Sequence, residues 1–551
     1  MILRVVLAAA TAASLLALAP TGALAAKAKV APTPKVVNSA YDYPVYDGVI
    51  DPMNAAIRSE LADAGTQGSF LEKRDAAGVA EYYAEQGYMP IWIEDGKLSD
   101  RALKVIARIK QAAEDGLDPS WYQLPPAQFG ALTMPTAAGI AHADVELSNA
   151  VVTFARNLHS GRLDPNAVSP NFSYQPNLLD PLAVLAAAST STDEGALFTS
   201  YNPPHPEFQA LRERLAEIRN QPAATPVMVA DGPTLKAGMS DWRVVNLRQR
   251  LNIADQVSDP LVYDDGVVAA VKAWQASKGL KADGMLGKAS LAVLNAVPAN
   301  PVSTILVNME RWRWMPQDLG PFYVRVNIPN FNLDIYRNDK VIFTTRIVVG
   351  QTDKQTPIFS DEIETADVNP TWNVPSSIAT KEMLPKAIAN PASLAGYQVF
   401  ENLDGSFRPV DPMQVDWSSV DMRRIQIKQP PGDDNALGSI KFLFPNPYAV
   451  YLHDTPSKSF FQRDYRALSH GCMRVQNPWD FAAVLLQDDP NVSVAKLKAL
   501  VGGRETAVAL THKIPVHITY FTAWIDDSGE LQLRNDLYGH DKEMEKDLGL
   551  S

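Results

Sequence analysis

The spacing of apolar residues changes partway along this 551-residue chain, and that change limits the folds open to it. In the first half, apolar residues recur three or four positions apart, as on one face of a helix, in segments 103–109 and 145–158. After Pro316 they alternate with other residues, the period of a half-buried strand, for example over 322–328. The chain is also too long for one hydrophobic core, so we expect two to four domains. The pattern predicts a multidomain α+β protein, with an all-α scaffold and a small helix bundle followed by a β-rich domain.

A helical scaffold domain is expected over residues 66–230. Its two clearest helical runs are followed by Gly116 and Gly161, and glycine is a usual residue just past a helix end. Three histidines are scattered singly in this block: His142, His159 and His205. No cluster of groups suited to catalysis accompanies them, so we expect them to have surface or structural roles.

A compact three-helix bundle is expected over residues 231–298. Apolar residues repeat at helical spacing in three short segments, near 244–251, 267–275 and 291–294. The Asp-Gly pairs of this region lack the ligand spacing of a calcium loop and therefore indicate turns. A helical connector, residues 299–320, follows the bundle.

A β-rich domain is expected over residues 321–540. Asn338-Asp339 stands between two alternating runs and predicts a hairpin turn. Strands are predicted at 322–328, 333–337, 341–350, 424–428, 449–452 and 516–524. The stretch from about 376 to 421 has helical and loop character and interrupts this pattern. An insertion of this kind beside an active site commonly acts as a lid, which is the role we expect here.

The N-terminus has the plan of a secretory signal peptide. A positively charged residue precedes the apolar run 5–18, and small residues stand at positions −3 and −1 of a cut after Ala25. The run is too short to span a bilayer comfortably, although retention as an uncleaved anchor stays open as an alternative. We therefore expect residues 1–25 to direct export, and residues 26–65 to form a tether with one short helix from Asp51.

Cys472 is the only cysteine of the chain. A protein exported to an oxidising compartment normally uses cysteines in pairs, and a lone thiol there is a reactive liability. A buried free thiol that packs as a small hydrophobic group is the alternative. The neighbours of Cys472 favour a nucleophile instead.

The chemically useful groups stand in two segments separated by 14 residues: Tyr451-Leu452-His453-Asp454 and Ser469-His470-Gly471-Cys472-Met473-Arg474. A thiol attacks as a thiolate, and its ordinary pKa of about 8.5 keeps it mostly protonated at neutral pH, so a base or cation must stand beside it. The two histidines can supply the base, and Arg474 adds a positive charge for a substrate carboxylate. Gly471 permits a tight turn whose N–H groups can stabilise an oxyanion. A metal site built from His453, His470 and Cys472, or a purely structural turn, is the alternative.

A longer series of motifs extends from this site: Gln429-Pro430-Pro431-Gly432, Asn435-Ala436-Leu437-Gly438, Phe444-Pro445-Asn446, His453-Asp454-Thr455-Pro456 and Ser469-His470-Gly471-Cys472-Met473-Arg474-Val475. Together they resemble the catalytic domain of the L,D-transpeptidases of peptidoglycan, in particular the large multidomain members of Gram-negative bacteria. Residues 80–122 and 158–165 are similar to the helical scaffold domain of that family. The segment 247–280 resembles a peptidoglycan-binding module. The resemblance covers roughly residues 60 to 540.

The resemblance implies that Cys472 is the nucleophile and that His453 is its general base and acid. A backbone carbonyl often orients this histidine in the family, so direct involvement of Asp454 stays open. Met473 stands where a β-branched residue is more usual, but both residue types are apolar.

The resemblance also assigns roles within the loop around the nucleophile. The backbone N–H groups of His470, Gly471 and Cys472 would form the oxyanion hole. Arg474 would orient substrate or brace the loop. Ser469, like the side chain of His470, would shape the loop rather than move protons.

The implied reaction is acyl transfer in two steps, with no metal or nucleotide cofactor. The cysteine would attack the third residue of a tetrapeptide stem and release D-alanine, and an amine of a second stem would then resolve the thioester into a 3→3 cross-link. Water could resolve it instead, giving an L,D-carboxypeptidase, as could a lysine of an envelope protein. A non-catalytic wall-binding factor is a further alternative, against which the intact catalytic pattern weighs.

The expected partners are peptidoglycan stems and glycan, met in the periplasm after export. The formal net charge of −12 argues against a protein that tracks nucleic-acid phosphates, because such proteins carry basic patches. The resemblance further implies that carbapenems acylate the cysteine while most penicillins do not.

Overall fold

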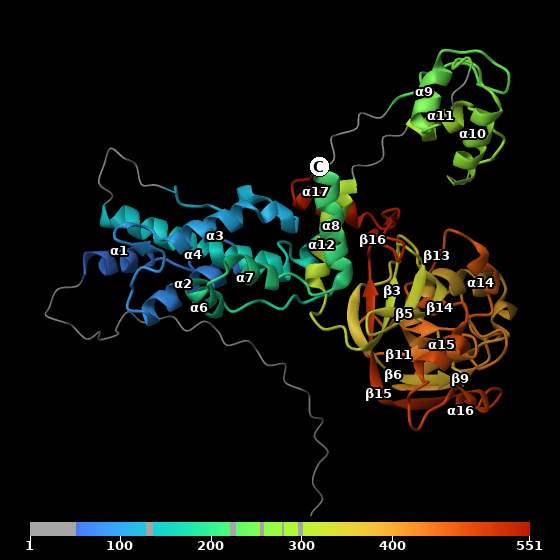
Figure 1. The fold of residues 1–551 in the computed structure, drawn as a ribbon. Coiled ribbons are helices and arrows are strands. Elements are labelled where there is room, and N and C mark those ends of the chain that lie inside the picture. Colours follow the sequence, from blue (N-terminus) through green and yellow to red (C-terminus); the bar gives the residue numbers. More distant parts are fainter. Residues whose placement is uncertain are drawn as a thin grey trace, which may run out of the picture. The chain divides into compact units, whose positions relative to one another are not determined.

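The computed structural model describes residues 51–127, 136–220, 227–253, 258–277, 280–295 and 301–550 (Figure 1). The expected signal peptide, residues 1–25, and the first part of the expected tether lie outside the described residues. The helix predicted from Asp51 is confirmed as α1 (Pro52–Glu60), and the Asp51 carboxylate caps it by accepting a hydrogen bond from the N–H of Met53 at 2.8 Å. Among the described helices, none combines the length and apolar character that crossing a membrane requires.

Helices dominate the described residues from 51 to 220, as the spacing of apolar residues predicts. They are α1, α2 (Phe70–Glu85), α3 (Asp100–Lys110), α4 (Ala137–Ser160), α5 (Pro165–Val168), α6 (Pro181–Thr190), α7 (Glu194–Ser200) and α8 (Pro206–Asn220). Gly116 follows α3 after a 3-10 turn, and Gly161 follows α4 directly. Their φ angles of 73° and 81° lie in a region that residues with a side chain rarely adopt, which explains why glycine ends both segments.

The three scattered histidines of this region contact protein groups. His142 is exposed and pairs with Glu60, with Nδ1 2.8 Å from Oε1. His205 is buried, and its Nε2 lies 3.0 Å from the carbonyl oxygen of Pro316. The Nδ1 of His159 lies 3.3 Å from a backbone carbonyl. Each ring therefore has a structural partner.

The helix expected in the connector, α12 (Pro301–Trp314), is present but is a buried core helix. Every residue from 305 to 314 is buried. Glu310 Oε1 accepts hydrogen bonds from the N–H groups of Arg162 and Leu163 at 2.5 and 2.7 Å. Arg313 donates to the carbonyl oxygens of Leu158 and Asp115, at 3.2 and 2.5 Å. Because Glu310 and Arg313 have these partners, the helix can be buried despite its charged residues.

The three predicted helices of the small bundle are confirmed as α9 (Arg243–Arg250), α10 (Asp265–Ser277) and α11 (Lys288–Asn295). They enclose a core of their own, which includes Val244, Leu247, Val267, Val271, Leu291 and Leu294. Gln275 Oε1 accepts the N–H of Gly284 at 2.9 Å, so Asp283-Gly284 is a turn held from within the bundle. Asp265-Gly266, in contrast, forms the first turn of α10 rather than a separate turn.

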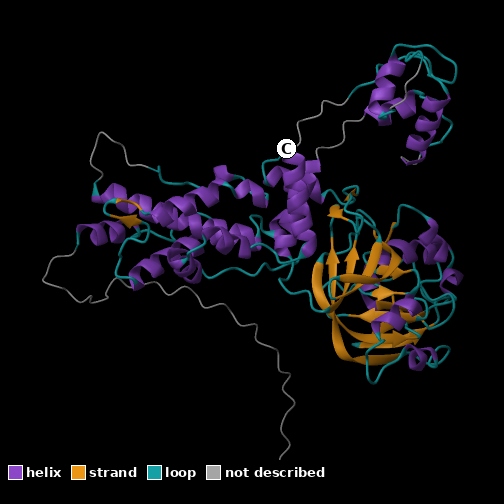
Figure 2. Ribbon diagram, viewed as in Figure 1, coloured by secondary structure: helices purple, strands orange, loops and turns teal. Residues whose placement is uncertain are grey.

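The β-rich region folds into a nine-stranded mixed sheet (Figure 2). The strands in sheet order are β13 (Ala467–Ser469), β5 (Lys340–Gly350), β14 (Met473–Val475), β12 (Leu452–His453), β11 (Ile440–Leu443), β6 (Phe359–Val368), β15 (Thr506–Thr519), β3 (Phe322–Asn327) and β4 (Asn332–Arg337). An additional pairing of β4 with β5 closes the sheet on itself. Asn338 and Asp339 join these two strands with φ angles of 48° and 60°, which confirms the predicted hairpin turn. The multidomain α+β architecture therefore agrees with the sequence pattern.

Two of the predicted strands are wrong in their bounds. The strand expected at 449–452 is reduced to β12, because Ala449 has a φ angle of 53° and the Asn446 side chain accepts the N–H of Val450 at 3.2 Å, so the segment turns. The strand expected at 516–524 is the end of the longer β15, and the chain leaves the sheet after Thr519. The short pair β16 (Ala523–Ile525) and β17 (Leu531–Leu533) then follows.

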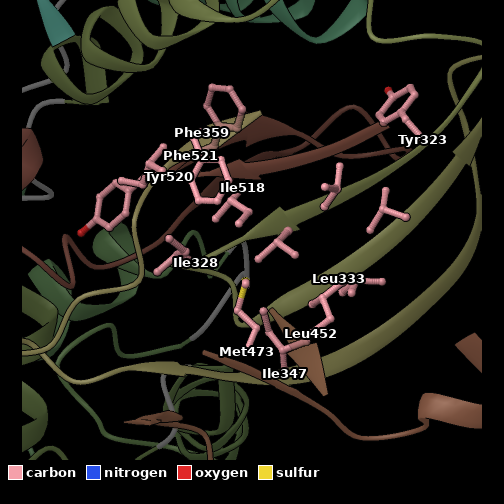
Figure 3. Packing of buried hydrophobic residues seen from close by; sticks show 14 of the residues in the cluster. Tyr323, Ile328, Leu333, Ile347, Phe359, Leu452, Met473, Ile518, Tyr520 and Phe521 are labelled. Atoms are coloured by element: carbon pink, nitrogen blue, oxygen red, sulfur yellow. The ribbon is translucent and has the colours of Figure 1, made fainter. Parts of the chain in front are cut away.

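The large sheet surrounds an apolar core that reaches the nucleophile loop. Leu452, Met473 and Ile347 lie side by side in this core and are each fully buried (Figure 3). Two helices, α15 (Pro478–Leu485) and α16 (Val494–Lys498), lie between β14 and β15 in sequence, and α17 (His540–Asp547) follows the last strand. The burial of Met473 shows that an unbranched apolar residue fills this position of the core.

The insertion from about 376 to 421 is a small folded unit rather than helix and loop alone. It contains α13 (Ser376–Ile378), a π-helical turn (Ala379–Met383), α14 (Leu384–Ala389), β8 (Gln398–Leu403) and β9 (Ser406–Val410). β8 and β9 form a four-stranded sheet with β7 (Trp372–Asn373) and β10 (Ile425–Gln429), in the order β7-β10-β8-β9. The unpredicted hairpin turns at Asp404-Gly405, where both φ angles are positive, at 55° and 86°.

Candidate active site

The pairing of β12 with β14 decides which of the predicted site residues share a face of the sheet. These strands are parallel, with Leu452 opposite Met473 and His453 opposite Arg474. Side chains alternate between the faces of a strand, and paired residues share a face. Because Leu452 and Met473 point into the core, His453 and Arg474 lie on the other face of the sheet. Cys472 is the last residue before β14.

His453 is buried and oriented by the backbone of the next residue. Its side chain is 3 % exposed, and its Nδ1 lies 2.5 Å from the carbonyl oxygen of Asp454. A carbonyl can only accept a hydrogen bond, so Nδ1 carries the proton of the neutral ring. This tautomer leaves Nε2 with a free lone pair, which is what a general base requires.

The Asp454 carboxylate serves the local structure instead of the histidine. It accepts hydrogen bonds from the N–H and hydroxyl of Ser439, at 3.0 and 2.9 Å, and pairs with Lys458 Nζ at 2.6 Å. A Cβ on Gly438 would meet this carboxylate at 2.4 Å, so glycine is required there. The structure therefore gives Asp454 a backbone contact with His453 and a separate anchoring role for its side chain.

Burial keeps both reacting groups neutral in the resting site. Burial raises the pKa of the Cys472 thiol to about 11, against opposing contributions from Tyr451 and Arg474. Burial, reinforced by the positive charge of Arg474, lowers the pKa of His453 to about 3. At neutral pH the thiol of Cys472 and the imidazole of His453 are therefore both neutral.

The Ser469 side chain closes the loop that carries Cys472. Its hydroxyl accepts the N–H of Gly471 at 3.1 Å and donates to the carbonyl oxygen of Cys472 at 2.6 Å. Gly471 has a φ angle of 115°, which favours glycine strongly. Because Ser469 occupies the N–H of Gly471, two of the three expected oxyanion donors stay available, those of His470 and Cys472. Neither of these donates to an acceptor in the part of the chain that the structure describes.

His470 connects the loop to the inserted unit. Its Nε2 pairs with Glu382 in the π-helical turn, and Lys354 Nζ reaches the same Glu382 oxygen at 2.9 Å. Both contacts lower the pKa of Glu382, with His470 contributing most. The ring of His470 is therefore engaged with a carboxylate. No group of three His, Cys, Asp or Glu side chains placed to hold a metal ion occurs within the described ranges.

Arg474 brings an unneutralised positive charge to the site. None of the ion pairs recorded for the described residues involves it, and its buried Nε has no hydrogen-bond partner among them. Its guanidinium carbon lies 5.7 Å from the centre of the Phe460 ring. The side chain is therefore free to attract a carboxylate or the thiolate formed at Cys472.

Four residues that contact this site were given no role in the sequence-based prediction. Tyr451 stands beside both reacting groups, with its ring centroid 5.7 Å from that of His453. The others are Lys354, Thr356 and Glu382, which approach the loop from the β5–β6 turn and from the inserted unit. Their contacts join segments distant in sequence, so no local motif marked them.

Comparison with known families assigns three parts of the chain. Residues 321–494 match the L,D-transpeptidase catalytic domain, residues 77–215 match the Scaffold domain, and residues 241–294 match the "Putative peptidoglycan binding domain". The catalytic-domain match contains the β12–β14 pair and the nucleophile loop.

A relative with curated description supports the same assignment. The chain is 33 % identical over 247 residues to a protein of Haemophilus influenzae described as a "Putative L,D-transpeptidase". The aligned region is 45 % of this chain and spans 50 % of the relative's length.

Solved structures of similar proteins align over part of the chain. An L,D-transpeptidase solved in complex with imipenem aligns at 15 % identity and a TM-score of 0.17, over 36 % of this chain and 59 % of its own. An L,D-transpeptidase from Mycobacterium smegmatis aligns at 13 % identity and a TM-score of 0.17, over 36 % of this chain and 58 % of its own.

Proposed function

Because residues 321–494 are an L,D-transpeptidase catalytic domain joined to a scaffold domain and a peptidoglycan-binding domain, we propose that this protein forms 3→3 cross-links between peptidoglycan stem peptides. One observation carries the proposal. The β12–β14 pairing sets Leu452 opposite Met473, the residues next to His453 and Cys472, and the carbonyl of Asp454 holds Nδ1 of His453, which supports a role for Nε2 in accepting the thiol proton.

In the first step, the sulfur of Cys472 attacks the carbonyl carbon of the third stem residue while His453 Nε2 takes the thiol proton. The carbonyl oxygen carries the negative charge of the tetrahedral intermediate. The carbon–nitrogen bond to the terminal D-alanine then breaks, and His453 returns the proton to the departing amine. A thioester remains on Cys472.

In the second step, an amine of another stem attacks the thioester carbon and His453 takes a proton from that amine. The carbon–sulfur bond breaks, the sulfur leaves with its electron pair, and the proton returns to it. The product is an amide that joins two stems, and no oxidant, reductant or cofactor enters the balance.

The position of Arg474 supports a substrate that carries a carboxylate. The tetrapeptide donor ends in the carboxylate of D-alanine, and a guanidinium without an acid partner is suited to attract it. This contact would hold the donor with its terminal residue in place until that residue leaves.

Two other acceptors use the same thioester. Water would give L,D-carboxypeptidase activity, and a lysine of an envelope protein would anchor that protein to the wall. The three reactions share Cys472 and differ only in the second step, so products rather than acyl-enzyme formation distinguish them.

The scaffold and peptidoglycan-binding domains suit an enzyme whose substrate is a polymer. Residues 1–25 would direct export of the chain to the periplasm, where that polymer lies. A module that binds peptidoglycan raises the effective concentration of stems near the catalytic domain. Carbapenems would act as mimics of the donor, since their strained lactam carbonyl can acylate Cys472.

Incubation of the full chain with disaccharide tetrapeptide, followed by mass spectrometry of the products, tests the proposal. We expect dimers that have lost one D-alanine and that carry a 3→3 bond. Disaccharide tripeptide without dimers would assign carboxypeptidase activity instead. Unchanged tetrapeptide, identical to the result with Cys472→Ala, would contradict an enzymatic role on this donor.

A further inference from the structure

The turn between β5 and β6 contacts the nucleophile loop through one buried threonine. Thr356 has 0 % of its surface exposed. Its hydroxyl donates a hydrogen bond to the carbonyl oxygen of Gly471 at 2.8 Å and accepts one from the N–H of Gly350 at 2.9 Å. A hydroxyl has one proton to donate, so these two contacts fix the direction of that proton.

The Gly471 carbonyl belongs to the peptide unit that ends in the N–H of Cys472. A trans peptide unit is planar, and its C=O and N–H groups point in opposite directions. Holding the Gly471 oxygen toward Thr356 therefore holds the Cys472 N–H toward the opposite side, away from the β5–β6 turn. That N–H has no protein acceptor in the described ranges, so it is available to a substrate.

The conformation of Gly471 makes an external support necessary. Glycine has no side chain to limit rotation about its backbone bonds, and the φ angle of 115° lies outside the regions where other residues are stable. The peptide unit after such a residue can rotate at little cost unless another group holds it. The Thr356 hydroxyl is the group that contacts its carbonyl.

Tyr538 braces Thr356 from the C-terminal part of the chain. Its hydroxyl accepts the Thr356 N–H at 3.3 Å and donates to the carbonyl oxygen of Gly350 at 2.7 Å. Its own N–H donates to the Tyr520 hydroxyl at 2.6 Å, and that hydroxyl donates to Asp536 at 2.8 Å. One phenol thus ties the two ends of the β5–β6 turn, from a position beyond the range 321–494 that matches the catalytic domain.

We propose that Thr356 is a positioning residue for acyl transfer, which holds the Cys472 N–H toward the oxygen of the acyl group, with Tyr538 as its brace. The inference rests on the proposed function of Cys472. Negative charge develops on that oxygen when the sulfur adds to the carbonyl carbon, and a preoriented N–H stabilises it. Thr356 touches neither the sulfur nor the substrate and acts only through Gly471.

Two small probes separate this role from a structural one in the full-length protein. Iodoacetamide alkylates Cys472 by displacement at a saturated carbon, so no oxyanion forms. p-Nitrophenyl acetate acylates Cys472 through a tetrahedral oxyanion and needs no stem recognition. In Thr356→Val, we expect acylation to slow by at least about tenfold, because outright loss of an oxyanion donor costs roughly 100- to 1,000-fold. Alkylation should keep the wild-type rate.

Three further variants complete the test. Thr356→Ser keeps the hydroxyl and should restore acylation, and Tyr538→Phe should slow acylation less than Thr356→Val. Thr345→Val is the matched control, because Thr345 is 4 % exposed in β5 and its buried hydroxyl has no hydrogen-bond partner among the described residues. It should leave both rates unchanged.

Acylation of Thr356→Val at the wild-type rate, or an equal loss of acylation and alkylation, would overturn the inference. The proposed function would be contradicted if p-nitrophenyl acetate acylated the wild-type chain but every stem peptide stayed unchanged. In that case the comparison of variants would still decide the role of Thr356.

Discussion

The base side and the oxyanion side of Cys472 are supported in different ways. On the base side, His453 is oriented by the carbonyl of the very next residue. On the oxyanion side, the Gly471 carbonyl is held by Thr356, which lies 115 residues away, and Thr356 contacts Tyr538, a further 182 residues away. One support is local to a strand end, and the other exists only when distant segments of the domain have assembled.

This difference separates two kinds of failure. A change on the base side should alter proton transfer, and therefore every reaction that needs the thiolate. A change on the oxyanion side should slow addition to a carbonyl while the thiol stays reactive toward other electrophiles. Variants of the two sides can thus be told apart by which reaction they lose.

Cys472→Ala should have the largest effect, because both sides serve the sulfur. We expect no cross-linked product from disaccharide tetrapeptide and an unchanged thermal unfolding midpoint. Cys472 is partly exposed, and its sulfur lies 3.9 Å from the carbonyl oxygen of Ala449, so a methyl group in its place should leave the fold intact. Product formation at any rate near that of the wild type would remove the thiol from the mechanism.

His453→Ala should be nearly as damaging, since a general base typically contributes about 100- to 10,000-fold. Asp454→Ala should cost much less activity, because the main chain rather than its carboxylate holds the ring. Its main effect should be a lower unfolding midpoint, through loss of the contacts with Ser439 and Lys458. Equal losses of kcat/KM in the two variants would make the Asp454 carboxylate a third catalytic member.

The pH profile sharpens the assignment of the base. Since the pKa of His453 is lowered to about 3 in the folded protein, the ring stays neutral and able to accept a proton well below pH 6.5. The unfolded chain takes up that proton near pH 6.5, so the free energy of unfolding should fall as pH drops from 6.5 toward 3. We expect kcat/KM to persist at pH 5 while the unfolding midpoint declines. An activity limb near pH 6.5, with no loss of stability, would contradict this environment for the ring.

Glu382→Gln should have a smaller effect, because it disturbs only the contact between the inserted unit and the loop. The carboxylate pairs with His470 and Lys354 in a partly exposed place, where an ion pair contributes about 0.2–1 kcal/mol. We expect a severalfold rise in KM for the stem, with kcat changed less. Glu401→Gln is the matched control, since Glu401 pairs with Arg424 elsewhere in the inserted unit, at 3.6 Å. The same change of KM in both variants would argue against a specific role for the contact.

Removal of the small bundle, residues 241–295, should have the smallest effect on chemistry. The bundle encloses its own core, and none of its described residues makes a recorded hydrogen bond to the loop around Cys472. We expect turnover of a small soluble stem to stay near the wild-type rate and binding to intact sacculi to weaken in a pull-down assay. A parallel loss of both activities in a folded variant would make the bundle part of the catalytic framework.

The fold could be predicted from the sequence wherever a single helix or strand shows the apolar spacing typical of its type. The helices before residue 220 and the Asn338-Asp339 hairpin follow from spacing and turn chemistry. The hairpin at Asp404-Gly405 carried the same turn signal but was not predicted. The burial of α12 could not be predicted, because Glu310 is paired by the loop after α4 and Arg313 by the carbonyl oxygen of Leu158 in α4.

For the candidate site, too, residues with a local sequence signal could be predicted, and residues that act through distant contacts could not. Cys472 and His453 stand in a motif whose spacing points to thiol chemistry, so the sequence selects them as candidates. Thr356, Tyr538 and Glu382 reach the loop only through contacts across many residues. A threonine or tyrosine of that kind has no distinguishing neighbours in the sequence, and its role appears only from the hydrogen bonds of the assembled domain.

The central claim is that Cys472 forms a thioester with an acyl donor. Its most direct test is intact-mass and peptide-mapping mass spectrometry of the full chain after incubation with a carbapenem. Because the chain has one cysteine, we predict a single adduct per chain, located on Cys472, absent from Cys472→Ala and slower to form in His453→Ala. An adduct that survives in Cys472→Ala, or no adduct on the wild-type chain, would contradict the account.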